Sequence, residues 1–152
     1  MIGYYNLITK IQDALITDVF VNQVTKGSLD VITNAKKDMY PLAHVMINNA
    51  KIESNVVVFN VSILVMDIVD YTKTDPIDLY FSNNNQDDVL HNTFLICQRF
   101  LENARRGGFA DLGISAETDT ADLEPFVERF TDDVAGWGMT LDLTIANDMT
   151  IC

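Results

Sequence analysis

Two histidines and a scatter of carboxylates are the residues of this chain that could take part in acid–base or metal chemistry. His91 follows Asp87 by four residues, so the two side chains share one face of a predicted helix. His44 lies among apolar neighbours in a predicted strand, which is typical of a structural histidine, either packed or exposed. A metal site normally needs three or four ligands, so one histidine and one carboxylate predict none.

The carboxylates are numerous but do not form a catalytic pattern. Asp67 and Asp70 end a predicted strand, and other acids lie in turns and loops, where they are common for structural reasons. None follows the EF-hand ligand series, and the chain has no P-loop, nucleophile-elbow, HExxH or CxxC motif. Paired carboxylates can support two-metal or glycosidic chemistry, but here we predict no catalytic, metal-binding or cofactor-binding residue and expect a protein that is not an enzyme.

The run Arg105, Arg106, Gly107, Gly108 combines cations and glycines as phosphate-binding loops do. Anion sites favour helix N-termini, where free N–H groups point outward, whereas this run ends a predicted helix. Arginines suit the negative end of a helix dipole and glycine ends the helix, so we interpret the run as a C-terminal cap. Trp137 opens an apolar strand face and is interpreted as a core or interface anchor.

Length and composition indicate one structural domain, residues 1–152. Hydrophobic residues make up 48% of the chain and the mean hydropathy is +0.10, which is enough for a core. The longest apolar stretch, residues 56–69, is interrupted by polar residues and falls short of the ~18 that a membrane helix needs. No signal-peptide pattern is visible, and Cys97 and Cys152 are expected to be reduced thiols. We therefore expect synthesis in a cytoplasm and no membrane partner.

The formal net charge is −12 at pH 7, and it is unevenly distributed. Residues 107–152 hold ten acids and one base, Arg129, whereas residues 1–106 contribute only −3. Sequence-independent DNA binding needs Lys and Arg to neutralise phosphates, so a duplex-gripping protein is excluded. An acidic surface can still serve DNA by repelling it, as in a pore through which DNA slides. The simpler interpretation is that the acids keep the protein soluble.

The hydrophobic pattern predicts an α+β domain, with an antiparallel or mixed β-sheet packed against two amphipathic helices in the order α-β-β-β-α-β-β. The apolar stripe of the second helix is predicted at Leu90, Phe94, Cys97, Leu101 and Ala104. Residues 56–71 are apolar on both faces and predict a central strand. The predicted helices are 3–18 and 87–106, and the predicted strands are 19–25 (with 29–32 after a turn), 40–52, 56–71, 123–130 and 137–145.

Two long loops, residues 72–86 and 108–124, interrupt these elements. Loops longer than about 12 residues in compact domains are usually functional or mobile. The first loop carries four large apolar residues, which is typical of contact with a partner: Ile77, Leu79, Tyr80 and Phe81. The second is acidic and ends at Pro125. Residues 123–130 are expected to pair back as a hairpin onto residues 137–145, whose other face is small or polar.

Three stretches carry a resemblance to a known group of proteins. They are PLAHVMINNAKIESNVVVFNVSILVMDIVD (41–70), QDDVLHNTFLICQRFLENARRG (86–107) and PFVERFTDDVAGWGMTLDLTIANDMTIC (125–152). In pattern and order they resemble small structural proteins of tailed bacteriophages. The nearest likeness is to head-to-tail connector or tail-terminator-type ring proteins, particularly of phages infecting Bacteroidota, including crAss-like phages.

The resemblance implies a tail-terminator-like fold and a homo-oligomeric ring of sixfold or twelvefold symmetry in the neck or tail of the virion. Such a ring joins portal, neck and tail proteins after assembly in the host cytoplasm, and double-stranded DNA passes through it without specific binding. Head-to-tail ring contacts are heterologous, so each subunit needs two different surfaces. The apolar residues of loop 72–86 then become subunit-interface candidates, and the strand edge 19–32 could extend a neighbour's sheet. The candidate lumen-facing acids are Asp119, Asp122, Glu124, Asp132 and Asp133.

Other classes of protein remain open. One is a small acidic binding module or inhibitor, such as a DNA mimic that presents carboxylates at phosphate-like spacing on a stable monomer. Another is a minor tail or baseplate protein. A third is a hydrolase with scattered carboxylates, which metal-dependent activity or stabilisation would reveal.

Overall fold

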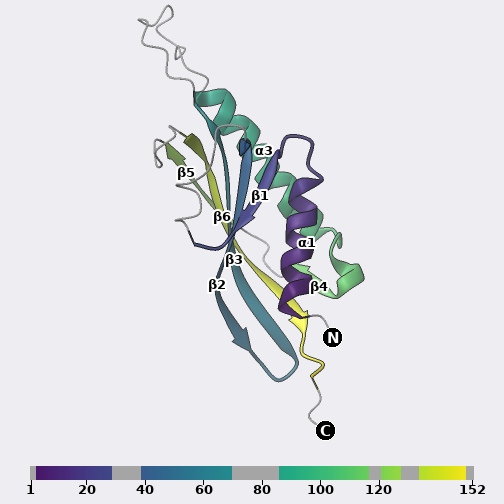
Figure 1. Ribbon diagram of the computed structural model, residues 1–152. Helices are drawn as coiled ribbons and strands as arrows, with labels where there is room; N and C mark the ends of the chain where they lie inside the picture. The colour runs from purple at the N-terminus through teal and green to yellow at the C-terminus, as the bar shows by residue number, and fades with distance from the viewer. Residues whose placement is uncertain (1–2, 29–38, 70–85, 117–120, 128–133, 150–152) are drawn as a thin grey trace, which may run out of the picture.

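The structure is a computed structural model. It describes residues 3–28, 39–69, 86–116, 121–127 and 134–149. This part of the chain forms an α+β domain with a mostly antiparallel sheet of six strands and two α-helices, as predicted (Figure 1). In chain order the elements are α1 (Tyr4–Ile16), β1 (Gln23–Lys26), β2 (Leu42–Ile52), β3 (Val56–Ile68), α3 (Gln86–Arg105), a short 3-10 helix η2 (Ala110–Leu112), β4 (Ile114–Ala116), β5 (Asp122–Val127) and β6 (Val134–Ala146).

The sheet is built around β3, which confirms the prediction of a central strand. Its order is β1-β2-β3-β6-β4, and β5 also pairs with β6. β1 runs parallel to β2, and every other pair is antiparallel. The longest register joins β3 to β6 from Val56 opposite Ala146 to Ile68 opposite Val134. The predicted hairpin between the last two strands is confirmed, because β5 pairs with the first half of β6.

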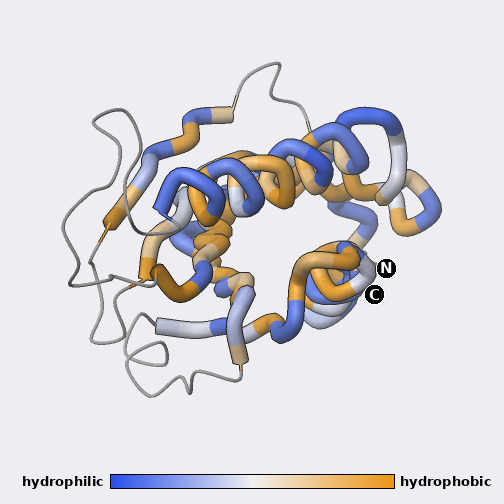
Figure 2. The backbone as a smooth tube through the Cα atoms, turned by 90° about the horizontal axis from the view of Figure 1, so that it is seen from above, coloured by the Kyte–Doolittle hydropathy of each residue, from blue (hydrophilic) through white to orange (hydrophobic). Residues whose placement is uncertain are grey.

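Both helices cover one face of the sheet. Viewed from above, they lie on the same side of the curved sheet, and α3 alternates between hydrophobic and hydrophilic residues (Figure 2). Alternate residues of β3 and β6 point toward them, and each buried aliphatic side chain contributes about 1.5–3 kcal/mol. The core residues include Leu7, Ile11 and Leu15 of α1, Ile96, Cys97 and Phe100 of α3, Val61, Ile63 and Val65 of β3, and Met139, Leu141 and Leu143 of β6.

The buried stripe of α3 differs from the predicted one at Phe94, whose side chain is 37% exposed. The neighbouring Thr93 is buried instead, because its hydroxyl donates a hydrogen bond to the Val89 carbonyl at 2.6 Å. A threonine satisfied in this way can occupy a core position that an apolar pattern does not reveal. In α1, the spacing of Tyr4, Ile8, Ile11 and Leu15 predicts one buried stripe, but Tyr4 is 48% exposed.

The prediction of a loop over 108–124 is wrong. The segment contains η2 and β4, and β5 begins within it at Asp122. Gly113 adopts a positive φ of 67° and ends η2, after which Ile114 pairs with Ile145 of β6. A strand of three residues is too short to show a period of two, so the sequence carries no signal for it.

Two strand boundaries also differ from the prediction. β1 covers residues 23–26 rather than 19–25, and β6 begins three residues before Trp137. The predicted cap after α3 is confirmed: Gly107 has a φ of 81°, and the Gly108 N–H donates to the Asn103 carbonyl at 2.8 Å. Residues 29–32 and 72–85 lie outside the described residues.

Candidate functional site: the sheet face opposite the helices

Polar side chains form a hydrogen-bonded row across the sheet face that points away from the helices. A β-bulge between Ile47 and Asn49 interrupts the ladder at Asn48. The Asn48 amide donates both its hydrogens, to Asn60 Oδ1 and to Ser62 Oγ, each at 2.7 Å. Asn60 in turn donates to Asp142 Oδ1 at 2.8 Å, and the Ser62 and Thr140 hydroxyls lie 3.1 Å apart. We call these five residues the polar row: Asn48, Asn60, Ser62, Thr140 and Asp142.

Two of the predicted lumen acids lie beside the polar row. In the β5–β6 register, Asp122 is opposite Thr140 and Glu124 is opposite Gly138. Directly opposed residues point to the same face of a sheet, so both acids share the face of Asp142. Asp122 and Glu124 are exposed and Asp142 is half-buried. These three carboxylates form what we call the acidic face.

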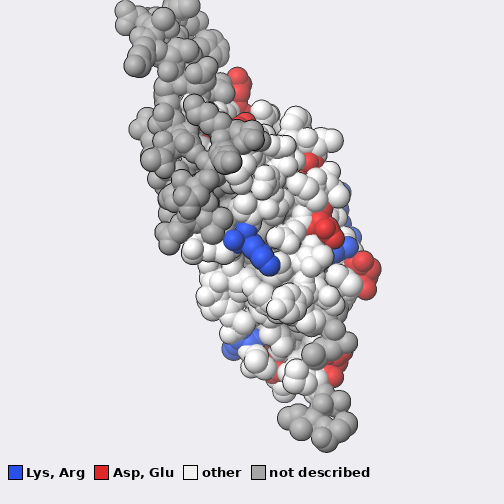
Figure 3. Space-filling view, in the orientation of Figure 1, with Lys and Arg blue, Asp and Glu red and all other residues white. Residues whose placement is uncertain are grey.

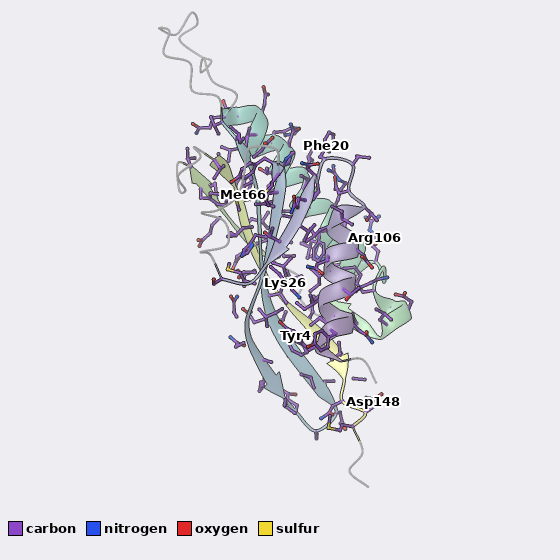
Figure 4. All side chains as sticks on the ribbon, in the orientation of Figure 1. Tyr4, Phe20, Lys26, Met66, Arg106 and Asp148 are labelled. Carbon is purple, nitrogen blue, oxygen red and sulfur yellow. The ribbon has the colours of Figure 1, made fainter. Side chains whose placement is uncertain are left out.

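Most cations of the described residues lie elsewhere. Five of the six belong to the helices or to β1 or directly follow α3: Lys10, Lys26, Arg99, Arg105 and Arg106. The sixth, Lys51 of β2, is opposite Val58 on the same sheet face as Asn60, and it pairs with Glu53 at 2.7 Å. Figure 3 shows basic side chains near the middle, at the right and at the lower left, with acidic side chains beside those at the right, and Figure 4 labels Lys26 near the middle and Arg106 at the right. Within the described part of the chain, the only cation on the strands from β2 to β6 is therefore Lys51, which is already paired with Glu53.

A hollow of about 360 Å³ lies beside the acidic face. Asp122 and Glu124 line it together with Leu64, Phe126 and Gly138. A Cβ atom on Gly138 would lie 2.9 Å from Leu64 Cδ2, so the absence of a side chain keeps this part of the face open. The hollow is lined by both apolar and acidic groups.

The other predicted site residues cannot be placed relative to this face. The lumen candidates Asp119, Asp132 and Asp133 lie outside the described residues. The same holds for the four interface candidates, Ile77, Leu79, Tyr80 and Phe81. Sequence analysis did not single out Asp142 or the polar row, although the alternation of Thr140 and Asp142 with apolar residues in β6 was a signal for them.

His44 is a structural residue, as predicted, and of the two alternatives it is the packed one. Its side chain is 0% exposed. Nε2 lies 3.0 Å from the Gly27 carbonyl, which can only accept, so Nε2 carries a hydrogen and Nδ1 accepts from the Thr25 hydroxyl at 2.8 Å. Burial lowers the pKa of His44 and keeps the ring neutral. His91 and Asp87 are exposed on α3.

Cys97 and Trp137 both belong to the packing between α3 and the sheet. The Cys97 thiol is buried, and burial raises its pKa to about 12. The Trp137 indole N–H donates to the Leu90 carbonyl at 2.8 Å, and its ring meets Phe94 edge-on with centroids 5.3 Å apart. Trp137 is therefore an anchor that ties β6 to α3.

Among the described residues, no three His, Cys, Asp or Glu side chains lie close enough together to hold a metal ion. The described helices also include none with the length and apolar character to cross a membrane. No protein-family model matches the chain, and no curated protein matches its sequence.

Proposed function

We propose that this chain is a structural protein of a tailed-bacteriophage virion that forms a ring in the neck or tail, as a head-to-tail connector or tail terminator. The observation that carries the proposal is the grouping of three carboxylates on one face of the sheet. Asp122, Glu124 and Asp142 share the face opposite the helices, where the one cation of the described strands from β2 to β6, Lys51, is paired with Glu53. The sequence resemblance to phage ring proteins supports the same function.

In this ring the acidic face points inward and borders the channel. Carboxylates repel the phosphates of passing DNA, so the duplex can slide without adhering. At physiological ionic strength this repulsion acts over about 8 Å. The acids must therefore lie at the channel wall and not at the outer rim of the ring.

The hydrogen bonding of the polar row is also suited to a channel wall. The Asn48 amide hydrogens are both taken up by Asn60 and Ser62, and Asn60 donates to Asp142. Donors that are already satisfied within the protein offer little to a phosphate oxygen. The wall then has repulsive carboxylates and few free donors, which is the surface that DNA transit needs.

A second candidate function is supported by the same carboxylates. A small acidic binding module that mimics DNA would also present Asp122, Glu124 and Asp142 on one open face. It would act as a stable monomer, whereas a connector must form a ring in the particle.

The deciding experiment is cryo-electron microscopy of virions of the phage that encodes the chain. We expect a closed ring on the portal–tail axis, with Asp122 and Glu124 facing the channel. Absence of the chain from the particle would overturn the proposal and favour the acidic binding module. A ring with these acids on its outer surface would overturn the lumen assignment alone.

A charge-reversal variant tests the role of the acidic face. Rings carrying Asp122→Lys and Glu124→Lys should bind duplex DNA in a salt-dependent way, because each cation releases phosphate counterions. Wild-type rings should not bind. The control is Asp13→Lys, which reverses a charge on the exposed side of α1. Equal DNA binding by the lumen variant and this control would contradict the assignment.

A further inference from the structure

A groove of about 550 Å³ lies between the start of α1 and the outer edge of β2, on the side of the sheet remote from β6. Tyr4 and Ile8 of α1 line it on one side, and Val45 and Ile47 of β2 line it on the other. Lys26, the last residue of β1, also contributes to it. Figure 4 shows Lys26 and Tyr4 on the same side of the molecule, with Lys26 above Tyr4. We call this the edge groove.

The edge groove lies where the described sheet is left open. β1 pairs with β2 only from Leu42 to Val45, and the Gly27 N–H ends this pairing on the Val45 carbonyl. β2 itself continues to Ile52. No strand of the described chain pairs with the outer edge of β2 beyond Val45. Its backbone groups can therefore receive an added strand.

The walls of the groove favour an apolar segment with an acid. Tyr4 is 48% exposed although it contacts Phe59, with ring centroids 6.3 Å apart. α1 begins after Gly3 with no side-chain cap and no acid in its first turn, so its positive end is not neutralised locally. Lys26 is exposed at the same groove. This positive character contrasts with the net charge of −12 of the whole chain.

The segment that follows β6 has matching chemistry. It runs Asn147, Asp148, Met149 and continues in sequence with Thr150, Ile151 and Cys152. Apolar and polar residues alternate from Asp148 to Ile151, as in a strand. At about 3.3 Å per residue the five residues after Asn147 span about 17 Å, enough to pair with most of the open part of β2.

The position of this segment favours binding to the edge groove of a neighbouring copy over binding to the groove of the same copy. The Asn147 N–H and Nδ2 donate to the Asn55 and Glu53 carbonyls, both at 2.9 Å, which fixes the chain at the β2–β3 hairpin. Met149 is then 64% exposed, so its side chain is not packed on its own domain. The segment leaves from β6, and the edge groove lies beyond β2 on the other side of β3. Two different surfaces on opposite sides are what a closed head-to-tail ring requires.

We infer that the edge groove binds, as an added β-strand, the segment that follows β6 of a neighbouring copy. The inference rests on the proposed ring. The bulge at Asn48 and the edge residue Lys51 protect β2 from indiscriminate pairing. Binding therefore depends on the side-chain match, with Met149 packed between Tyr4 and Ile8, and Asp148 near Lys26.

Disulfide trapping tests the contact directly. In a Cys152→Ser background, one copy carries Ser28→Cys at the groove and another carries Met149→Cys. The two are co-expressed, the assembled rings are isolated, and mild oxidation is applied. We expect a disulfide between the two copies, since a bond forms only when the Cα atoms approach within about 7 Å. The matched control replaces Ser28→Cys by Asp13→Cys on the exposed side of α1, and no bond should form.

A second pair of variants tests the contact by its effect on assembly, without a crosslink. Met149→Asp should raise the concentration needed for assembly about tenfold or more, because it removes a buried apolar side chain from the contact. Val19→Asp, at a side chain that is 90% exposed and remote from the groove, should leave assembly unchanged.

The outcomes separate the two proposals. Rings of normal mass that show no crosslink and tolerate Met149→Asp would overturn the edge-groove contact and leave the ring intact. A disulfide formed within single copies that carry both cysteines would show that the segment binds its own groove, and would also overturn the inference. Absence of any ring, in solution and in the particle, would overturn the proposed function itself.

Discussion

Gly136 is a position where a single methyl group should destabilise the whole domain. It lies in β6 opposite Met66 of β3 and Phe126 of β5, so a paired strand flanks it on each side. A Cβ atom there would overlap the Val65 carbonyl oxygen and lie 2.8 Å from Met66 Cα. Both obstacles are backbone atoms of the central strand and cannot rotate away. Overpacking typically costs about 1–3 kcal/mol, and we expect Gly136→Ala to lower the free energy of unfolding by about 3 kcal/mol.

Gly138→Ala is the matched control, two residues further along the same strand. A Cβ atom there would lie 2.9 Å from Leu64 Cδ2, the tip of a side chain that can change rotamer. The lower entropy of the unfolded chain with alanine offsets part of this contact by about 0.4–1 kcal/mol. We expect a change within about 1 kcal/mol, well below the effect at Gly136.

Urea unfolding measures both effects, with Trp137 fluorescence and far-ultraviolet circular dichroism as probes. A loss of about 3 kcal/mol from a total of about 5–15 kcal/mol shifts the midpoint clearly. The same loss should lower Tm by about 6–12 °C. If Gly136→Ala were as stable as Gly138→Ala, the close approach of β3 and β6 at this point would be refuted.

Three further predictions concern buried groups. Burial holds the folded-state pKa of His44 below its usual 6.5, so the unfolded state gains a proton first as the pH falls. The free energy of unfolding should therefore decrease below about pH 6.5, and less steeply in His44→Gln, as urea titrations at several pH values will show. Cys97, whose pKa is raised to about 12, should resist a thiol reagent at pH 8 in a Cys152→Ser background until the protein unfolds. Asp18 accepts from Arg99 Nε at 2.6 Å and Nη2 at 3.0 Å, so Asp18→Asn should lower the free energy of unfolding by about 1–2 kcal/mol in thermal or urea melts.

Each of these has a clear contrary result. If the free energy of unfolding had the same pH profile in the wild type and in His44→Gln, the predicted linkage between protonation of the His44 ring and folding would be contradicted. Rapid labelling of Cys97 in the native protein would show that the helix–sheet core opens readily. A neutral effect of Asp18→Asn would mean that the Arg99 pair does not hold the segment after α1 against α3.

The main elements could be predicted because their residue patterns reflect what they contact. Residues 56–68 are rich in β-branched side chains because β3 is flanked by strands on both sides and faces the helices with one surface. The end of α3 at Gly107 follows from the positive φ that glycine adopts most easily. Local patterns failed where a tertiary contact decided the outcome. β4 pairs with β6, and Thr93 of α3 is buried although its side chain is polar.

The acidic face could likewise be predicted only in part. Asp122 and Glu124 could be predicted as lumen candidates from the excess of acidic residues in 107–152, but they were predicted to lie in a loop. Their common face with Asp142 depends on the register between β5 and β6, which a single sequence does not encode locally. The alternation of Asp122 and Glu124 with Leu123 and Pro125 was the available signal for a strand.

The position of β6 affects how each copy of the protein is made. β6 is synthesised after every other described strand, yet it lies between β3 on one edge and β4 and β5 on the other. About 65 residues separate the end of β3 from the start of β6, which corresponds to roughly 3–13 s of translation at 5–20 residues per second. During that time β3, the central strand of the sheet, has an open edge that can pair with other chains. We expect a prematurely terminated chain to stay in this state and to be degraded, so that translation errors are removed before any copy can compete for a place in an assembly.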